Sequence, residues 1–202
     1  YRYRSTGYSI GQCFGYKIDY SNGNGYINTQ EELDNALATY QVGGTPRLGD
    51  FLYVDINEDG VIDEKDQAPI KYSDIPRITY GFSGSVNWKN FDFSFLFSGI
   101  AKASRVYTGW GATEFGLVGF YSDYHLQAWT AERYANGEEI KYPALAYSPG
   151  TSQKANDFFI LDRSFLRLKN IELGYTLPKK LLKKVGINST RVYVNGNNLL
   201  TW

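Results

Sequence analysis

Two neighbouring stretches of the chain alternate large apolar residues with small or polar ones. In residues 78–88 the large side chains fall at nearly every even position, and in residues 91–99 they fall mainly at odd positions. A period of two predicts strands with two unlike faces. Only Lys89 and Asn90 separate the stretches, and Asn tolerates the positive φ that a two-residue connection needs. We therefore expect a β-hairpin.

The second face of this hairpin carries Thr, Gly, Ser, Asn and Asp, where a half-buried soluble strand normally shows Lys, Glu or Arg. Each stretch is also close to the roughly 9–11 residues that a tilted strand needs to cross a bilayer. Tyr80 and Trp88 lie where an interfacial aromatic belt would fall. The pattern indicates two strands of an outer-membrane barrel. An edge hairpin of a soluble β-sandwich is the alternative.

Two elements are predicted before the hairpin. Residues 14–20 alternate as a short strand that ends in a cluster of Ser, Asn and Gly. Thr29 is a candidate N-cap, and the Glu that follows three residues later completes the pattern of a capping box. We expect a short helix over residues 29–40, lying on the surface because its apolar face is narrow.

Three elements are predicted near the end of the chain. Residues 158–177 return to strand character, but the parity of their apolar positions slips at Lys169-Asn170, which predicts a β-bulge or two separate exposures of the strand. Residues 178–186 form a turn of helix closed by Gly186. A further strand covers residues 191–202.

An Asp-rich loop lies within residues 50–66. Oxygen-bearing residues occupy alternate positions, Gly60 permits a sharp bend, and Val61 would contribute its backbone carbonyl. Calcium needs six or more converging oxygens. We therefore predict a structural calcium site with the ligands Asp55, Asn57, Asp59, Val61, Asp63 and Asp66. Asp66 stands where the best-known loops have Glu, which weakens bidentate coordination, and a solvated acidic region of Asx turns is the alternative.

Residues 101–157 show no regular alternation and are rich in Tyr, Trp, Gly and Pro. A connection this long is usually functional or disordered, and its aromatic content argues against disorder. His125 has no His, Cys or carboxylate at ligand spacing, so we interpret it as a loop residue and not a metal ligand. Aromatic rings here could stack on sugars or peptide side chains, with packing against neighbouring loops as the alternative. The candidate ligand contacts are Tyr107, Trp110, Phe115 and Trp129.

Composition narrows the classes of function. The 21 basic and 21 acidic residues give zero net charge, so no nucleic-acid partner is expected. Aromatic residues make up 17% of the chain, which favours strands and aromatic girdles. No apolar run reaches about 18 residues, which excludes a helical membrane span, whereas a mean hydropathy of -0.40 is compatible with barrel strands. Met is absent, so we expect an internal or processed segment.

Chemistry-bearing side chains do not form a catalytic pattern. The single Cys13 excludes an internal disulfide framework and is predicted to be a buried small hydrophobe. No Ser/His/Asp or Cys/His arrangement is recognisable, and outside the acidic loop no carboxylates form a pair. We therefore predict no catalytic residue and no enzymatic activity.

The most distinctive motifs are Asp55-Ile56-Asn57-Glu58-Asp59-Gly60 within residues 49–63, Ile75-Pro76-Arg77-Ile78-Thr79-Tyr80-Gly81-Phe82, Leu166-Arg167-Leu168-Lys169-Asn170-Ile171-Glu172-Leu173-Gly174-Tyr175 within residues 164–178, and Asn195-Gly196-Asn197-Asn198-Leu199-Leu200-Thr201-Trp202 within residues 191–202. In this order and spacing they closely resemble the C-terminal barrel region of the SusC/RagA family of TonB-linked outer-membrane transporters. The resemblance is weakest in residues 21–48 and 101–157.

The resemblance implies an all-β fold: an antiparallel transmembrane barrel of about 22 strands with long extracellular loops. It implies import of oligosaccharides or peptides, an N-terminal plug that contacts TonB, a SusD-like surface lipoprotein as partner, and surrounding outer-membrane lipid. Residues 1–202 would be a partial C-terminal portion of this barrel, without the plug and the final strands. Residues 50–66 would be its calcium-type loop and residues 101–157 a long extracellular loop. The alternative is a secreted, calcium-stabilised carbohydrate-binding β-sandwich.

Overall fold

The computed structural model describes residues 2–3, 6–107, 121–147, 150–183 and 186–202. The chain divides into two compact units. One unit combines Tyr1–Ile75 with Ser104–Leu161, and the other combines Pro76–Ala103 with Asp162–Trp202.

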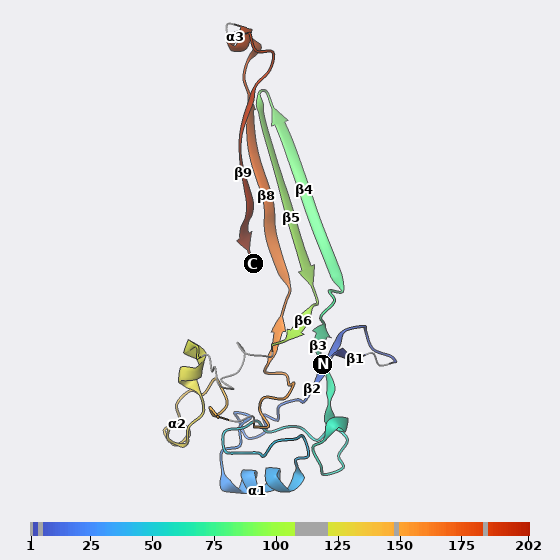
Figure 1. Ribbon diagram of the computed structural model, residues 1–202, viewed down its shortest axis with the longest axis vertical. Helices are drawn as coiled ribbons and strands as arrows, with labels where there is room; N and C mark the ends of the chain where they lie inside the picture. Colours follow the sequence, from blue (N-terminus) through green and yellow to red (C-terminus); the bar gives the residue numbers. More distant parts are fainter. Residues whose placement is uncertain (1, 4–5, 108–120, 148–149, 184–185) are drawn as a thin grey trace. The chain divides into compact units, whose positions relative to one another are not determined.

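The second unit is built on a four-stranded antiparallel sheet with the order β4-β5-β8-β9 (Figure 1). Its strands are β4 (Ile78–Trp88), β5 (Phe91–Ala101), β8 (Phe165–Thr176) and β9 (Arg191–Thr201), with the short helix α3 (Lys179–Leu182) between the last two in sequence. The predicted hairpin and the predicted later strands are confirmed. The sheet does not close on itself, because β4 and β9 form its two edges.

The turn between β4 and β5 differs from the expectation in one detail. Trp88 pairs with Phe91, so Lys89 and Asn90 form the whole connection. The positive φ, 55°, falls on Lys89 and not on Asn90. The turn therefore keeps its predicted length, but its left-handed residue is the one that sequence preference disfavours.

The register of the four strands separates two faces. Val86, Phe93, Leu173 and Val194 lie opposite one another in one row, and Phe82, Phe97, Leu168 and Leu200 in another. Rows of the opposite parity are mostly polar: Ser85, Ser94, Glu172 and Asn195 form one, and Gly81, Ser98, Arg167 and Thr201 another. We call these the apolar face and the polar face.

The predicted β-bulge is confirmed. Leu96 and Phe97 of β5 pair with Asn170 and Leu168 of β8, so Lys169 has no partner on β5. On the other side of β8, Asn170 pairs with Asn197 of β9 and Leu168 pairs with Leu200. Two residues of β9 therefore lie opposite Lys169. The two strands therefore both bulge at this level, and the parity of the apolar positions is restored across the sheet.

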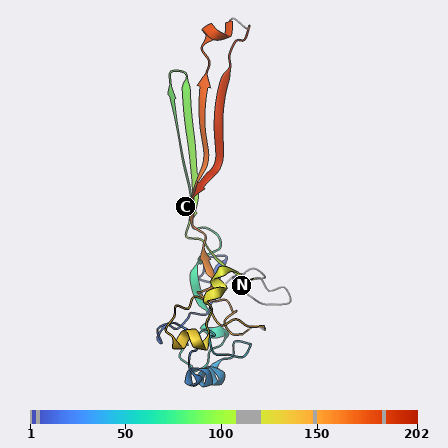
Figure 2. The same ribbon diagram turned by 90° about the vertical axis from the view of Figure 1, so that its left-hand side faces the viewer.

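The sheet is a single layer (Figures 1 and 2). Nearly every residue of β4 and β9 is exposed, on both faces. Phe82 is 52% exposed, Val86 57% and Trp88 63%. A sheet of a soluble sandwich would bury one such set of side chains against a second sheet. Within the described residues of this unit no such second sheet is present.

The first unit has short elements joined by long connections. A three-stranded sheet has the order β1-β2-β3, and β6 pairs with β7. The elements are β1 (Arg2–Tyr3), β2 (Gln12–Gly15), α1 (Gln30–Thr39), η1 (Glu64–Asp66), β3 (Ala68–Ser73), β6 (Ser104–Val106), η2 (Asp123–Gln127), α2 (Ala131–Ala135) and β7 (Ile160–Asp162).

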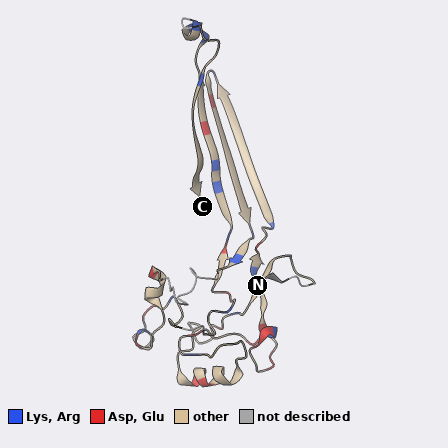
Figure 3. Cartoon of the chain, viewed as in Figure 1, with Lys and Arg blue, Asp and Glu red and all other residues tan. Residues whose placement is uncertain are grey.

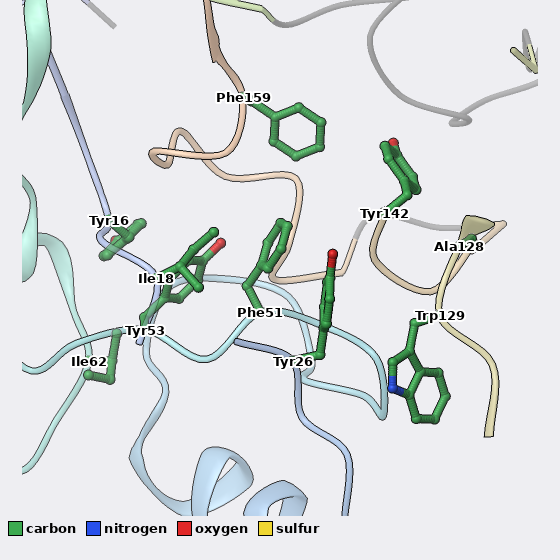
Figure 4. Close-up of a cluster of buried hydrophobic side chains, with 10 residues drawn as sticks. All are labelled: Tyr16, Ile18, Tyr26, Phe51, Tyr53, Ile62, Ala128, Trp129, Tyr142 and Phe159. Carbon is green, nitrogen blue, oxygen red and sulfur yellow. The ribbon is translucent and has the colours of Figure 1, made fainter. Parts of the chain in front are cut away.

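Buried aromatic side chains hold the first unit together (Figure 4). Tyr26 stacks on Phe51 with 5.3 Å between ring centroids, and Tyr16 packs on Tyr53 at 4.9 Å. Residues from the long segment 101–157 complete this core, among them Trp129 and Tyr142. The segment expected to be an irregular loop therefore supplies part of the core and contains local elements of its own.

The predicted helix is confirmed as α1. The Thr29 side chain accepts a hydrogen bond from the Glu32 N–H, and the Glu32 carboxylate accepts one from the Thr29 N–H. Only Ala36 of the helix is buried, as a narrow apolar face requires. The strand predicted over residues 14–20 is shorter, because β2 ends at Gly15 and Ile18 makes only an isolated bridge to Tyr53.

No helix among the described residues is long and apolar enough to span a membrane.

Candidate functional site

The apolar face of the sheet has aromatic side chains at both ends. At the hairpin-turn end the Trp88 and Phe91 rings lie 6.5 Å apart, and Phe91 lies 4.6 Å from Tyr175. At the opposite end the Tyr80 hydroxyl donates to the Phe165 carbonyl at 3.0 Å, and Trp202 lies 6.4 Å from Phe97. Aromatic girdles that flank an apolar band are typical of strands that cross a bilayer.

The polar face carries a network of charged groups near the hairpin turn. Arg191 of β9 donates through Nε to Asp92 Oδ1 of β5 at 3.0 Å, and through a terminal nitrogen to Glu172 Oε1 of β8 at 2.6 Å. The same terminal nitrogen of Arg191 also donates to Asp92 Oδ2. One guanidinium thus links three strands, and the network keeps an excess of one carboxylate.

The four strands carry few charged residues (Figure 3). By the strand register, all but one of them occupy positions of the polar face. They are Asp92, Arg167, Glu172 and Arg191, and the exception is the bulge residue Lys169. Hydrogen bonds between neighbouring strands continue along this face, from Asn170 to Asn197 at 2.9 Å and from Arg167 to Thr201 at 3.0 Å. This face is suited to water or to a polar partner.

The two faces and the open edges together define what the sheet can do. Large exposed apolar side chains suit a hydrocarbon environment, whereas the ionic groups need a wet one. The outer edges of β4 and β9 have no partner strand in this sheet. A bilayer could accommodate such edges only if further strands paired with them.

Asx turns organise the acidic loop. Asp55 accepts hydrogen bonds from the N–H groups of Glu58 and Gly60 at 2.7 and 2.8 Å. Gly60 has a φ of 83°, so the predicted sharp bend is present. Asp66 is fully buried and accepts from the N–H groups of Ile56 and Asp63 at 2.8 Å each. The hydrogen bond from the Val61 N–H lowers the pKa of Asp59.

Three observations bear on whether this loop can hold a cation. Its donor set consists of oxygens, as calcium requires. Lys65 Nζ lies 3.3 Å from Asp63 and 3.5 Å from Asp59, so a cationic group is already drawn to these carboxylates. Within the described residues no three His, Cys, Asp or Glu side chains converge as a metal-binding group. Binding would require the Lys65 ammonium to withdraw and the carboxylates to turn inward.

Of the four predicted aromatic ligand contacts, the structure describes Tyr107 and Trp129. Tyr107 is 42% exposed and its N–H donates to the Phe159 carbonyl. Trp129 is 7% exposed, and its indole N–H donates to Asn28 Oδ1 at 3.0 Å, so its ring serves the core and offers little surface to a ligand. Trp110 and Phe115 lie outside the described residues. Ligand binding by these side chains stays a prediction.

A buried polar network in the first unit was not expected from the sequence. The Ser152 hydroxyl donates to Asp50 at 2.8 Å and accepts from the Phe51 N–H at 2.9 Å. The Tyr53 hydroxyl donates to the Thr151 carbonyl, and burial raises the pKa of Tyr53 well above its ordinary value. These residues are about one hundred positions apart in sequence, and no local pattern marks them.

His125, expected to be a loop residue, lies in the short 3-10 helix η2 and is buried. Its Nδ1 accepts a hydrogen bond from the Ser122 N–H at 2.9 Å, and its ring lies 4.6 Å from that of Tyr142. Among the described residues Nε2 has no hydrogen-bond partner. The ring therefore caps the short helix η2 and packs against the aromatic core.

No family model matches the chain. The chain is 30% identical over 181 residues to the TonB-dependent receptor P26 of Formosa agariphila, and this match covers 88% of the chain and 17% of the receptor. It is 29% identical to the TonB-dependent receptor P3 of the same organism, over 97% of the chain and 18% of the receptor. The chain thus spans less than a fifth of these relatives.

The fold of the chain is also similar to parts of solved transporter structures. The RagAB peptide transporter matches with a TM-score of 0.60 and 29% identity, over 76% of the chain and 17% of the matched protein. The RagAB peptide importer in an open state matches the whole chain with a TM-score of 0.57 and 25% identity, over 20% of the matched protein.

Proposed function

Because the chain belongs to the TonB-dependent receptors, which are outer-membrane proteins and not enzymes, we propose that its sheet is part of the wall of a nutrient-importing barrel. The observation that carries this proposal is the separation of the two faces in a sheet without a second layer. Exposed Phe, Val, Leu and Trp side chains occupy one face, and the ionic groups other than Lys169 occupy the other. In our proposal the apolar face contacts lipid and the polar face lines the lumen.

The free edges of β4 and β9 support closure by strands of the longer protein, in a barrel of about 22 strands. The connections at the two ends of the sheet differ in length. Lys89-Asn90 and residues 177–190 join strands at one end, whereas residues 102–164 leave from the other. Outer-membrane barrels have short turns on the periplasmic side and long loops outside. We therefore propose that residues 50–66 and 101–157 belong to extracellular loops.

The cargo in this proposal is a peptide or an oligosaccharide. The matched RagAB structures are described as those of a peptide transporter and importer, which supports a peptide. By the same analogy we propose a SusD-like lipoprotein as partner and TonB as the source of energy, acting through a plug.

Site-specific labelling of the full-length receptor tests the orientation of the faces. Single Cys residues at Tyr80, Phe82 and Phe93 should report a lipid environment when they carry a polarity-sensitive fluorophore. Cys at Ser83 and Ser85 should report water or plug protein. A Cys13→Ser background removes the native thiol. Equal accessibility of both sets to an aqueous quencher would refute the proposal.

We also propose that residues 50–66 bind calcium as a structural brace. The bend at Gly60 and the backbone hydrogen bonds that Asp55 accepts already give the loop a shape that supports this proposal. Asp55→Ala combined with Asp59→Ala should abolish calcium binding to the full-length receptor in calorimetry. Glu58→Gln is the matched control, because Glu58 lies in the same loop but is not a predicted ligand. Unchanged binding in the double variant would show that this loop is not the site.

A further inference from the structure

The apolar face has a groove with a volume of about 340 Å³. Apolar side chains and one glycine supply most of its lining: Phe93, Ile171, Leu173, Val194, Gly196 and Leu199. The remaining lining residues, Glu172 and Asn195, have register positions on the polar face. The volume falls in the range of about 300–1,000 Å³ that is typical of small-molecule sites.

The groove results from the bulge in β9. Asn198 takes a φ of 54° there, and the extra residues place Leu199 over Gly196. A Cβ at position 196 would come within 2.7 Å of Leu199 Cδ1, so a larger residue at this position would fill the groove. The neighbouring row, from Phe93 through Leu173 to Val194, forms its other wall.

Basic side chains gather at the nearby end of the strands. The groove row lies two residues from the aromatic row of Phe91 and Tyr175, a distance of about 7 Å along a strand. Beyond that row Lys89 lies over the Trp88 ring at 4.7 Å, and the exposed Lys179, Lys180 and Lys183 follow β8. Residues 177–190 contain no Asp or Glu, so this end attracts anions.

We propose that the groove holds an acyl chain of an anionic phospholipid whose headgroup contacts these lysines. This inference rests on the proposed function, in which the apolar face meets hydrocarbon. A lipid that lies along the strands would place its phosphate beyond the aromatic row and its chain over Leu173 and Gly196. The apolar lining favours binding of the lipid's acyl chain, and the lysines favour a negatively charged headgroup.

Native mass spectrometry of the full-length receptor in detergent tests the inference, with phosphatidylglycerol and phosphatidylcholine as probes. Gly196→Leu should weaken retention of phosphatidylglycerol by about tenfold or more, because the filled groove excludes methylene groups. Val86→Leu is the matched control: it places a Leu side chain at an exposed position of the same face on β4, two strands away from the groove residues of β8, and should leave retention unchanged. Lys179→Glu with Lys180→Glu should remove the preference for phosphatidylglycerol over phosphatidylcholine.

Equal retention of phosphatidylglycerol by Gly196→Leu and the unmodified receptor would overturn the inference, as would equal retention of the two lipids by the unmodified receptor. If Gly196→Leu does not assemble, Leu199→Ala removes one wall and should give the same loss. The Cys-labelling experiment distinguishes a failure of the lipid-site inference from a failure of the proposed function. A lipid environment at Phe93 without selective retention would refute the groove site alone, whereas an aqueous environment there would refute the proposed function.

Discussion

Two adjacent buried hydroxyls in the first unit should respond in opposite ways to removal. Ser152 makes two hydrogen bonds, donating to the buried Asp50 carboxylate and accepting from the Phe51 N–H. Thr151 is fully buried, and its hydroxyl oxygen has no hydrogen-bond partner among the described residues. We expect Ser152→Ala to destabilise the unit and Thr151→Val to be neutral or stabilising.

The magnitude follows from the groups that lose their partner. Ser152→Ala leaves one buried carboxylate oxygen without a donor and one buried N–H without an acceptor. Each such loss costs about 1–3 kcal/mol, so the expected total is about 3 kcal/mol. Asp50 keeps the hydrogen bond from the Arg47 N–H at 3.0 Å, which limits the loss at the carboxylate. Thr151→Val preserves the shape of the side chain and removes a group that gains nothing from burial.

Hydrogen–deuterium exchange of the full-length receptor measures both effects locally. In Ser152→Ala the amide of Phe51 should exchange about a hundredfold faster, since about 1.4 kcal/mol corresponds to a factor of ten. In Thr151→Val its exchange should be unchanged or slower. If Thr151→Val accelerates exchange as much as Ser152→Ala does, the hydrogen-bond assignment is wrong.

Two further predictions concern the backbone of the first unit. Gly49→Ala should lower the free energy of unfolding by more than about 2 kcal/mol, because Gly49 has a φ of 82° and the added Cβ would lie 2.5 Å from a Trp129 ring atom. Gly23→Ala is the control, because Gly23 has a φ of 97° but its Cβ would meet no atom within 4 Å. Equal loss of thermal stability in the two variants would contradict the packing argument. Thr29→Ala should cost about 1 kcal/mol in exchange protection of α1. Burial raises the pKa of Glu32, but hydrogen bonds from Asn22, Asn28 and Thr29 outweigh burial and lower it. The exchange protection that Glu32 gives to α1 should therefore be present above pH 4.5 and fall as the pH drops below that value. Exchange protection of α1 that does not change with pH would refute the capping box.

Local patterns in the sequence determined the strands, the hairpin, the bulge and the capped helix. Alternation has a period set by the backbone itself, so β4 and β5 could be predicted from their own residues. The parity slip at Lys169 predicted the bulge for the same reason, since one extra residue reverses the faces. The small and polar second face likewise indicated a membrane-spanning sheet before any contact was known.

Only the tertiary structure decided which distant residues meet. Arg191 and Asp92 are separated by 99 positions and Ser152 and Asp50 by 102, and nothing in the residues around them marks the pairing. For Trp129 the sequence left ligand contact and packing open as alternatives, and the tertiary structure places its ring in the core because the long segment folds back onto residues 26–53. The groove at Gly196 also depends on strand register. Periodicity is a property of a short stretch, whereas packing depends on how distant stretches close upon one another.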